Sequence, residues 1–182
     1  MSGSVGRAVQ ADERDLTGGL KICWPTSATD ILADYQREHQ TWRSEAPELA
    51  PYVSESDQEA LQAAADQGLL MTLQDDRGFA GLVAATTAPL FGRPALCMLE
   101  LLLAGHLRGK GVAAVVQSVF LAGQRSGADT VWGHIHAANL PSLRTAQRLG
   151  RRPVQQEYFV GLSAPRRPDP RSAGCDNIVG ES

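Results

Sequence analysis

The residues best suited to chemistry lie in one stretch, 101–113, which reads LLLAGHLRGKGVA. A strand that ends in a turn with alternate glycines and passes at once into a helix leaves several backbone N–H groups aimed at one spot, which favours a bound anion. Gly109 and Gly111 permit a positive φ and a close approach, and Arg108 and Lys110 add positive charge. The stretch therefore predicts a phosphate site, with an ordinary glycine-rich surface turn as the alternative interpretation.

Two well-known nucleotide loops do not account for this turn. The spacing differs from GxxxxGK followed by Ser or Thr, so a nucleoside triphosphate loop is not matched. The dinucleotide pattern GxGxxG fits only loosely, because Ala114 takes the place of its third glycine and Asp129 precedes the next strand instead of ending it. The dinucleotide fingerprint is therefore weak here.

A second polar group lies at residues 139–142, Asn-Leu-Pro-Ser, where the proline can begin a helix that Gly150 ends. Asn139 and Ser142 suit two roles equally well. Both residue types cap helices through a side-chain oxygen, and both can hydrogen-bond to a ligand at a helix start. The two roles can coexist, so both stay open at this point.

Two titratable side chains stand on predicted strands. By strand alternation Trp132, His134 and His136 share one face, and a histidine with an unperturbed pKa of about 6.5 can act as a base at neutral pH. Glu100 lies among apolar neighbours on another strand, so its carboxylate needs a partner or a raised pKa. For both residues, a structural hydrogen bond or a solvent-facing position is the alternative.

The elements that must position these residues begin with a short strand at residues 20–24. The capping spacing of Ser27 and Asp30 predicts a first helix directly after it. Residues 56–59, SDQE, form a capping box for a second helix, which Gly68 can end. The inner face of the first helix is expected to hold Ile31, Leu32, Tyr35 and Trp42.

From residue 69 onwards the pattern changes to that of strands. Residues 69–74 and 79–87 predict a hairpin, because turn-forming residues separate two runs with strand composition. The apolar residues 95–104 add a third strand. Three strands in succession predict an antiparallel meander.

A helix from Val112 leads from this meander to a strand at residues 130–136. A strand, helix and strand in that order require a crossover, so 95–104 and 130–136 should be parallel. A helix from Leu140 and a final strand at 153–162 follow. The predicted fold class is therefore α/β, with a mixed, mostly antiparallel central sheet flanked by helices.

On two motifs the sequence resembles the GNAT superfamily of N-acetyltransferases. Arg108-Gly109-Lys110-Gly111-Val112-Ala113 matches the family's loop, Gln or Arg followed by x-x-G-x and Gly or Ala. Asn139-Leu140-Pro141-Ser142 followed by Leu149-Gly150 is similar to its ending, N-x-x with Ala or Ser and then L-G. The resemblance covers nearly all of residues 20–162 and implies the GNAT fold.

In relatives of this kind acetyl-coenzyme A lies between two splayed strands, which the resemblance places at 95–104 and 130–136. Backbone amides of the loop would bind the pyrophosphate, main-chain groups of the first strand would pair with pantetheine, and the N–H of Leu103 would polarise the thioester carbonyl. Asn139 and Ser142 would hold the pantetheine arm and phosphate. The implied cofactor-binding residues are Leu101, Leu102, Leu103, Arg108, Gly109, Lys110, Gly111, Val112, Ala113, Asn139 and Ser142.

Acetyl transfer to an amine needs a base, because only the neutral amine attacks. His134 lies where several relatives carry a glutamate that faces the acceptor, so His134 is the first candidate catalytic residue and Glu100 the second. Many relatives protonate the departing thiolate with a tyrosine, and Ala146 occupies that position here. Water or another group, such as Tyr158, would have to replace this general acid.

The implied function is an acetyl-coenzyme A dependent N-acetyltransferase, an acyltransferase acting on a primary amine of a small molecule, peptide or protein by direct attack in a ternary complex. Residues 35–52 would shape the acceptor pocket, and their acids and aromatic side chains suit an amine without naming one. Ala146 keeps a second hypothesis open, a non-catalytic or weakly active GNAT-fold module that binds acyl-coenzyme A. A homodimer is a further expectation, since many relatives dimerise.

The length of the chain, 182 residues, and its composition fit a protein with a single domain. A formal net charge of -3 gives no support to a nucleic-acid partner, although contact of the basic turn with nucleic acid is a third interpretation. Three cysteines without a CxxC pair predict a reduced, cytoplasmic protein with no metal site. The apolar stretches are too short to predict a signal peptide or a membrane span. The expected organisation is a flexible tail at 1–19, a GNAT domain at 20–162 and a flexible tail at 163–182.

Overall fold

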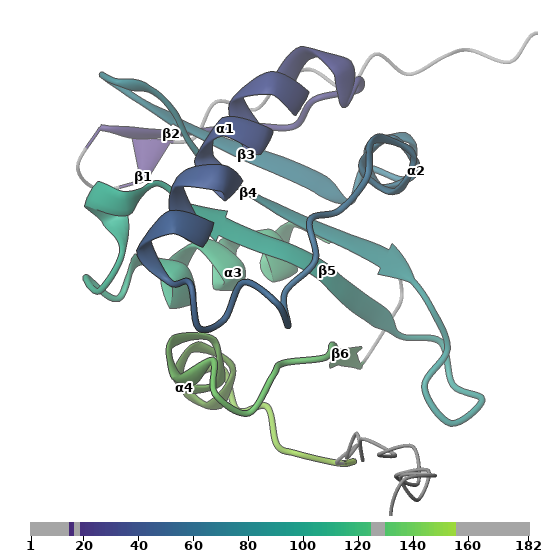
Figure 1. Ribbon diagram of the computed structural model, residues 1–182. Helices are drawn as coiled ribbons and strands as arrows, with labels where there is room; N and C mark the ends of the chain where they lie inside the picture. The colour runs from purple at the N-terminus through teal and green to yellow at the C-terminus, as the bar shows by residue number, and fades with distance from the viewer. Residues whose placement is uncertain (1–14, 17–18, 125–129, 156–182) are drawn as a thin grey trace, which may run out of the picture. The chain divides into compact units, whose positions relative to one another are not determined.

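The structure is a computed structural model, and it describes residues 15–16, 19–124 and 130–155. Six strands form one sheet whose order follows the sequence, β1-β2-β3-β4-β5-β6 (Figure 1). Neighbouring strands are antiparallel except β5 and β6, which are parallel, as predicted. The strands are β1 (Asp15–Leu16), β2 (Leu20–Cys23), β3 (Leu70–Asp75), β4 (Gly78–Thr87), β5 (Leu96–Leu103) and β6 (Val131–Trp132).

Helices cover both faces of this sheet. In Figure 1, α1 crosses in front of the strands and α3 lies behind them. A short 3-10 turn, η1, connects β5 to the loop that begins α3. The helices are α1 (Thr29–Glu45), α2 (Gln58–Asp66), η1 (Gly105–Leu107), α3 (Val112–Gly123) and α4 (Leu140–Arg148). The predicted mixed α/β fold class is confirmed.

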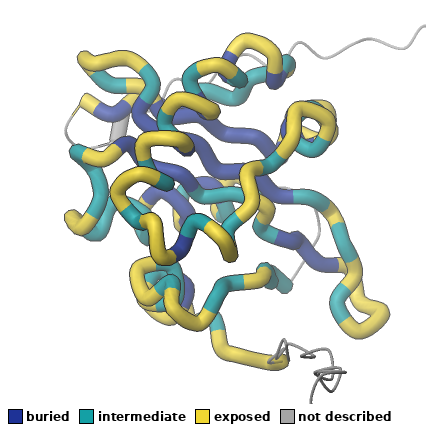
Figure 2. The backbone as a smooth tube through the Cα atoms, in the orientation of Figure 1, coloured by how far each residue is buried: buried dark blue, intermediate teal, exposed yellow. Residues whose placement is uncertain are grey.

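The core lies along the central strands, which are drawn dark blue in Figure 2. β4 is buried without interruption from Ala80 to Ala85, as expected of a strand that is covered on both faces. Tyr35 of α1 and Phe120 of α3 are the largest fully buried side chains. Burial of these apolar faces is what holds the two helices against the sheet.

The helix starts follow the capping rules, with two corrections. Asp57, not Ser56, caps α2, because its side chain accepts a hydrogen bond from the Ala60 N–H at 2.8 Å. The N-cap is therefore one residue later than predicted, and the capping box at residues 56–59 does not form, because Ala60 is the third residue of the helix. α1 has Ala28 at its N-cap position, and Ser27 contributes one residue earlier by accepting from the Thr29 N–H at 3.3 Å.

The strand predicted at residues 130–136 is much shorter in the structure. β6 pairs with β5 only at Leu96–Val131 and Cys97–Trp132. The next residue, Gly133, lies so close to β5 that an added Cβ would be 3.2 Å from the backbone oxygen of Met98. No strand is assigned to residues 133–136, so the prediction that alternation places Trp132, His134 and His136 on one face of a strand is wrong.

The remaining sequence predictions concern the chain ends. In the predicted final strand, residues 153–155 have no regular secondary structure and 156–162 lie outside the described residues. Every described helix and strand belongs to the unit Met1–Arg152. The boundaries predicted at residues 19 and 162 stay predictions. Among the helices described, none has the length and apolar character to cross a membrane.

Candidate active site

Among the described residues, the parallel strand pair leaves most of one edge of β5 without a neighbouring strand. β6 pairs with β5 at the first two residues of β5, Leu96 and Cys97. Beyond them, the Ala104 N–H donates to a carbonyl at the end of β4 at 2.9 Å. Because main-chain groups of a strand alternate between its two sides, those of Leu101 and Leu103 face away from β4. We call this side of β5, from residue 98 to residue 103, the free edge.

A glycine loop follows the free edge directly. Gly109 and Gly111 have φ values of +73° and +80°, and Gly111 is the N-cap of α3 without any side-chain cap. The first-turn N–H groups of a helix have no acceptor within it, and here they carry the partial positive charge of the helix dipole. A Cβ added at Gly109 would have no atom within 4 Å. The loop therefore has the open space and the donors that a phosphate group needs.

Arg108 fixes the junction between the free edge and α1. Its Nε donates to the Leu103 carbonyl oxygen at 2.7 Å, its Nη2 pairs with Glu38 at 2.6 Å, and its Nη1 pairs with Glu45. Glu38 also accepts a hydrogen bond from the Gly105 N–H at 3.1 Å. The Arg108 charge, which the sequence assigns to phosphate binding, is thus matched by two carboxylates, and the exposed Lys110 is the loop's other cation.

Glu100 stands on the free edge and is hydrogen-bonded on both carboxylate oxygens. The Tyr35 hydroxyl donates to Oε2 at 2.7 Å, and the Leu101 N–H donates to Oε1 at 3.2 Å. Burial raises the pKa of Glu100, and the charge of Glu55 raises it further, while the Tyr35 hydrogen bond opposes both. Burial and the neighbouring Glu100 also raise the pKa of Tyr35, so Tyr35 is the donor in this pair.

His39 lies one helical turn after Tyr35 and is 1% exposed. Within the part of the chain that the structure describes, neither of its ring nitrogens has a hydrogen-bond partner, and Nδ1 is 4.0 Å from Oε2 of Glu55. The rings of Tyr35 and Trp42 are 5.8 and 5.5 Å away. Burial lowers the pKa of His39 and Arg43 lowers it further, whereas Glu55 raises it, so His39 is neutral at pH 7.

We name Tyr35, His39, Glu55, Ser56 and Glu100 the acceptor cluster. The Ser56 N–H donates to the Tyr35 hydroxyl at 2.8 Å, so two successive hydrogen bonds lead from the segment before α2 to Glu100. The sequence predicted Tyr35 on the inner face of the first helix, Glu100 as a candidate base and Ser56 only as part of a capping box, and it indicated no role for Glu55. His39 was one of the residues in 35–52 predicted to shape the acceptor pocket, and it lies four residues from Tyr35 and three from Trp42 on the same helical stripe.

The unpartnered ring of His39 predicts a stabilising substitution. His39→Leu is expected to increase the free energy of unfolding by about 1 kcal/mol, since it removes two buried polar atoms without hydrogen bonds. The gain corresponds to a rise of about 2–4 °C in Tm. His106→Leu is the matched control, because His106 has a partner in Asp75 at 2.6 Å and its loss should destabilise.

The same pair of variants has a pH signature. The unfolded chain titrates His39 near pH 6.5, and the folded chain does so at lower pH, so the unfolded state binds more protons in this window and stability falls as the pH drops below about 6.5. His39→Leu should lose that contribution. Chemical denaturation at several pH values measures it, and a decrease in stability for His39→Leu at pH 7 would contradict the prediction.

The other predicted site residues lie after β6. His134 is exposed and its ring lies 5.3 Å from that of Trp132 in an edge contact. The side chain of Asn139 accepts a hydrogen bond from the Ser142 N–H at 3.2 Å, so Asn139 caps α4. The ring of His136 stacks on Tyr52 at 4.1 Å, which joins the segment after β6 to the linker between α1 and α2. Val112 and Ala113 begin α3, as predicted.

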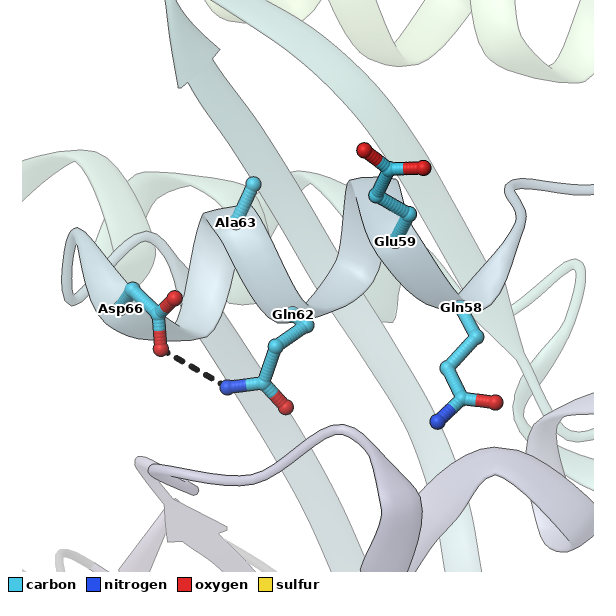
Figure 3. A pocket seen from close by; sticks show the side chains of 5 residues that line it. All are labelled: Gln58, Glu59, Gln62, Ala63 and Asp66. Carbon is cyan, nitrogen blue, oxygen red and sulfur yellow. Dashed lines mark hydrogen bonds between the residues drawn. The ribbon is translucent and has the colours of Figure 1, made fainter.

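Figure 3 shows the residues that line a pocket on the surface, and none of them belongs to the free edge, the glycine loop or the acceptor cluster. All five lining side chains come from α2, and the hydrogen bond drawn joins Gln62 to Asp66 at 2.8 Å. A single helix supplies no converging groups from different elements, which a ligand site normally has. The free edge, the glycine loop and the acceptor cluster together are the better candidate. The described residues contain no cluster of His, Cys, Asp and Glu that could hold a metal ion.

No protein-family model matches the sequence, and no curated protein sequence matches it either. Solved structures match its fold. A mutant of the BH1408 protein from Bacillus halodurans has a TM-score of 0.58 and 16% identity, covering 79% of this chain and 99% of its own. The ribosomal-protein-alanine N-acetyltransferase from Brucella melitensis biovar Abortus 2308 has a TM-score of 0.55 and 11% identity, with the same two coverages.

A third similar structure is the diaminobutyrate acetyltransferase from Paenibacillus lautus, solved with its substrate L-2,4-diaminobutyric acid and coenzyme A. Its TM-score is 0.55 at 15% identity, covering 71% of this chain and 74% of its own. At such low identities the likeness shows the fold alone. That fold is the one shared by GNAT-type acetyltransferases, as the two motifs predicted.

Proposed function

We propose that this protein is an acetyl-coenzyme A dependent N-acetyltransferase that acts on a primary amine. The observation that carries the proposal is the free edge of β5, which leads directly into a glycine loop at the start of α3. A fold of this type in an acetyltransferase solved with coenzyme A adds support. An extended arm pairing with the free edge and a pyrophosphate at the loop would use both features at once.

Different residues of this chain would bind different parts of acetyl-coenzyme A. The Leu101 carbonyl and the Leu103 N–H offer hydrogen bonds along the free edge, because the Leu101 N–H already donates to Glu100 and the Leu103 carbonyl accepts from Arg108. The N–H groups of residues 109–113 offer donors to pyrophosphate. Lys110 adds charge. In this proposal Arg108 acts indirectly, by orienting the Leu103 peptide group through its carbonyl oxygen. Asn139 caps α4, and Ser142 in its first turn stays a predicted contact for the cofactor.

Chemistry at the free edge needs a proton acceptor and an oxyanion donor. Bound acetyl-coenzyme A would supply a thioester whose carbonyl carbon forms a bond with the amine nitrogen as its bond to sulfur breaks and the thiolate leaves. Glu100 would take the proton that the amine loses, and the Leu103 N–H would donate to the oxygen that becomes negative. The raised pKa of Glu100 suits this role, because it brings the base nearer to neutral pH.

Ala146 favours the second candidate function, a binding module without turnover. It is buried on α4 at the position where relatives place a tyrosine acid, and it has no proton to give. A thiol with a pKa of about 8.5 can nevertheless leave as thiolate and take a proton from water. A thiol-release assay with acetyl-coenzyme A and a panel of amines distinguishes the two candidates, since binding without release supports the module.

Cofactor binding can be tested with paired glycine variants. Gly109→Glu is expected to weaken acetyl-coenzyme A binding at least tenfold, because it puts a carboxylate where the pyrophosphate would lie. Gly92→Glu is the control: Gly92 also has a positive φ, +77°, with no atom within 4 Å of an added Cβ, so both variants carry similar backbone strain. Only Gly109 belongs to the loop.

Thermal denaturation with and without the ligand provides the measurement. At about a hundredfold excess of acetyl-coenzyme A over its Kd, the natural chain and Gly92→Glu should gain about 2.7 kcal/mol, and Gly109→Glu should gain distinctly less. If the natural chain, well folded, shows no shift at saturating ligand, the proposed function is wrong. Equal ligand-induced shifts in both variants would mean that acetyl-coenzyme A binds to the protein but not at the glycine loop.

A further inference from the structure

The acceptor cluster contains a carboxylate that the chemistry proposed above does not use. Glu38 and Glu45 are both paired with Arg108. Glu55 differs, because among the described residues its ion-pair contact is with His39, whose Nδ1 is 4.0 Å from Oε2 and therefore beyond hydrogen-bond distance. The Glu55 side chain is 34% exposed, so a ligand can reach it.

His39 is the second feature without an explanation. A buried ring with no hydrogen bond on either nitrogen is costly, and native proteins keep few of them. Apolar residues would fill this position on α1 at lower cost, between the rings of Tyr35 and Trp42. Because the ring is neutral, it does not compensate the negative charge of Glu55, although its Nδ1 lies 4.0 Å from Oε2 of that residue.

Glu55 also lies close to the proposed base. The residue after it, Ser56, donates its N–H to the Tyr35 hydroxyl at 2.8 Å, and Tyr35 donates to Glu100 at 2.7 Å. Two carboxyl groups of different character therefore occur in one cluster. Glu100 accepts one hydrogen bond on each carboxylate oxygen and stands on the free edge, whereas the Glu55 side chain is 34% exposed.

We propose that Glu55, with His39 behind it, is an ammonium subsite that selects acceptors carrying a second positive charge besides the reacting nitrogen. This inference rests on the proposed function and narrows its acceptor to diamines and polyamines. The reacting nitrogen must become neutral at Glu100, so it cannot compensate the charge of Glu55 during attack. A second ammonium group on the same molecule would do so, and a monoamine would leave the carboxylate unpaired.

Matched acceptors can test the subsite. Butane-1,4-diamine and hexane-1,6-diamine each have a counterpart, 4-aminobutan-1-ol and 6-aminohexan-1-ol, of similar length with a neutral far end. With acetyl-coenzyme A bound, at least one diamine is expected to show a Kd or KM about tenfold lower than its amino alcohol. Glu55→Gln should abolish this difference. Glu59→Gln, an exposed glutamate at the start of α2, is the control and should preserve it.

A second readout needs no turnover. NMR of the His39 imidazole should show that Glu55→Gln lowers its pKa, and that the diamine also lowers it in the natural chain, because both remove negative charge from beside the ring. The amino alcohol should leave that pKa nearly unchanged. The full chain with bound coenzyme A is used, so the cofactor side is present in each measurement.

The outcomes separate this inference from the proposed function. Diamine binding that depends on Glu55, without thiol release from acetyl-coenzyme A, would support the subsite and overturn the transferase. Thiol release with equal preference for diamine and amino alcohol would support the transferase and overturn the subsite. Glu55→Gln with unchanged selectivity and an unchanged His39 pKa would also overturn the subsite, and the same change in Glu59→Gln would show that the effect is general surface charge.

Discussion

Replacing Gly81 by alanine is expected to reduce the free energy of unfolding by about 4 kcal/mol or more, the largest stability effect that we predict. A Cβ added at Gly81 would lie 2.4 Å from the Leu102 carbonyl oxygen and 3.1 Å from the Cα of Leu103. Both are backbone atoms of the neighbouring strand, so no side chain can rotate away. The φ of Gly81, +149°, adds strain for any other residue.

Gly78→Ala is the matched control for this prediction. Gly78 begins the same strand with a φ of +104°, but an added Cβ there has no atom within 4 Å. Its substitution should cost only the backbone strain, about 1–3 kcal/mol. Urea denaturation of both variants measures the difference. Equal losses would mean that the close approach of β4 and β5 is not what requires glycine at residue 81.

A side chain at residue 81 should also affect the candidate site, because Leu103 of the free edge lies opposite Gly81. Gly81 pairs with Leu103, whose carbonyl oxygen accepts from Arg108 on the opposite side of β5. A side chain at residue 81 would push Leu103 towards the free edge. Any folded fraction of Gly81→Ala should therefore bind acetyl-coenzyme A less tightly than Gly78→Ala, which a thermal-shift titration can show.

Sequence reasoning succeeded where the determinants are local. The glycine loop before α3 follows from Gly109 and Gly111 themselves, because a helix start and a positive φ depend on neighbouring residues only. The start of α4 at Asn139 was predictable for the same reason. The parallel pairing of β5 with β6 followed from the intervening helix, since only a crossover can join such strands.

Sequence reasoning failed where the determinant is a contact over a long range. The pairing of β6 with β5 ends at Trp132, and the next residue, Gly133, lies close to Met98 of β5, an arrangement that no local pattern in the sequence predicts. The prediction that His134 shares a strand face with Trp132 was wrong for the same reason, because side chains alternate between two faces only within a strand. The partners of Arg108 on α1 lie 63 and 70 residues away in the sequence. The loop motif alone could therefore not predict that Arg108 forms ion pairs with Glu38 and Glu45.

α1 connects the two halves of the candidate site. Tyr35 and His39 on its inner face belong to the acceptor cluster, and Glu38 and Glu45 hold Arg108 at the end of β5. A single helix of 17 residues thus fixes both the base and the start of the glycine loop. Changes that tilt α1 should therefore alter acceptor and cofactor binding together.

Glu100→Gln is expected to lower kcat by about 10²–10⁴-fold, the usual contribution of a general base. The amide keeps the shape of the side chain: its oxygen can accept from the Leu101 N–H while its NH2 group donates to the Tyr35 hydroxyl oxygen, so acetyl-coenzyme A affinity should change little. The variant should also be more stable at neutral pH. With its folded pKa raised, Glu100 favours the protonated form, so its contribution to stability is lost as the pH rises through that pKa.

The pH profile decides between Glu100 and His134 as the base. The acidic limb of kcat/KM should lie above the ordinary range of a glutamate, and Tyr35→Phe should move it higher, because the lost hydroxyl no longer stabilises the carboxylate. His134→Gln should reduce kcat by less than about tenfold, since its ring is exposed beside Trp132. The reverse pattern, with a small loss for Glu100→Gln and a large one for His134→Gln at every pH, would assign the proton transfer to His134.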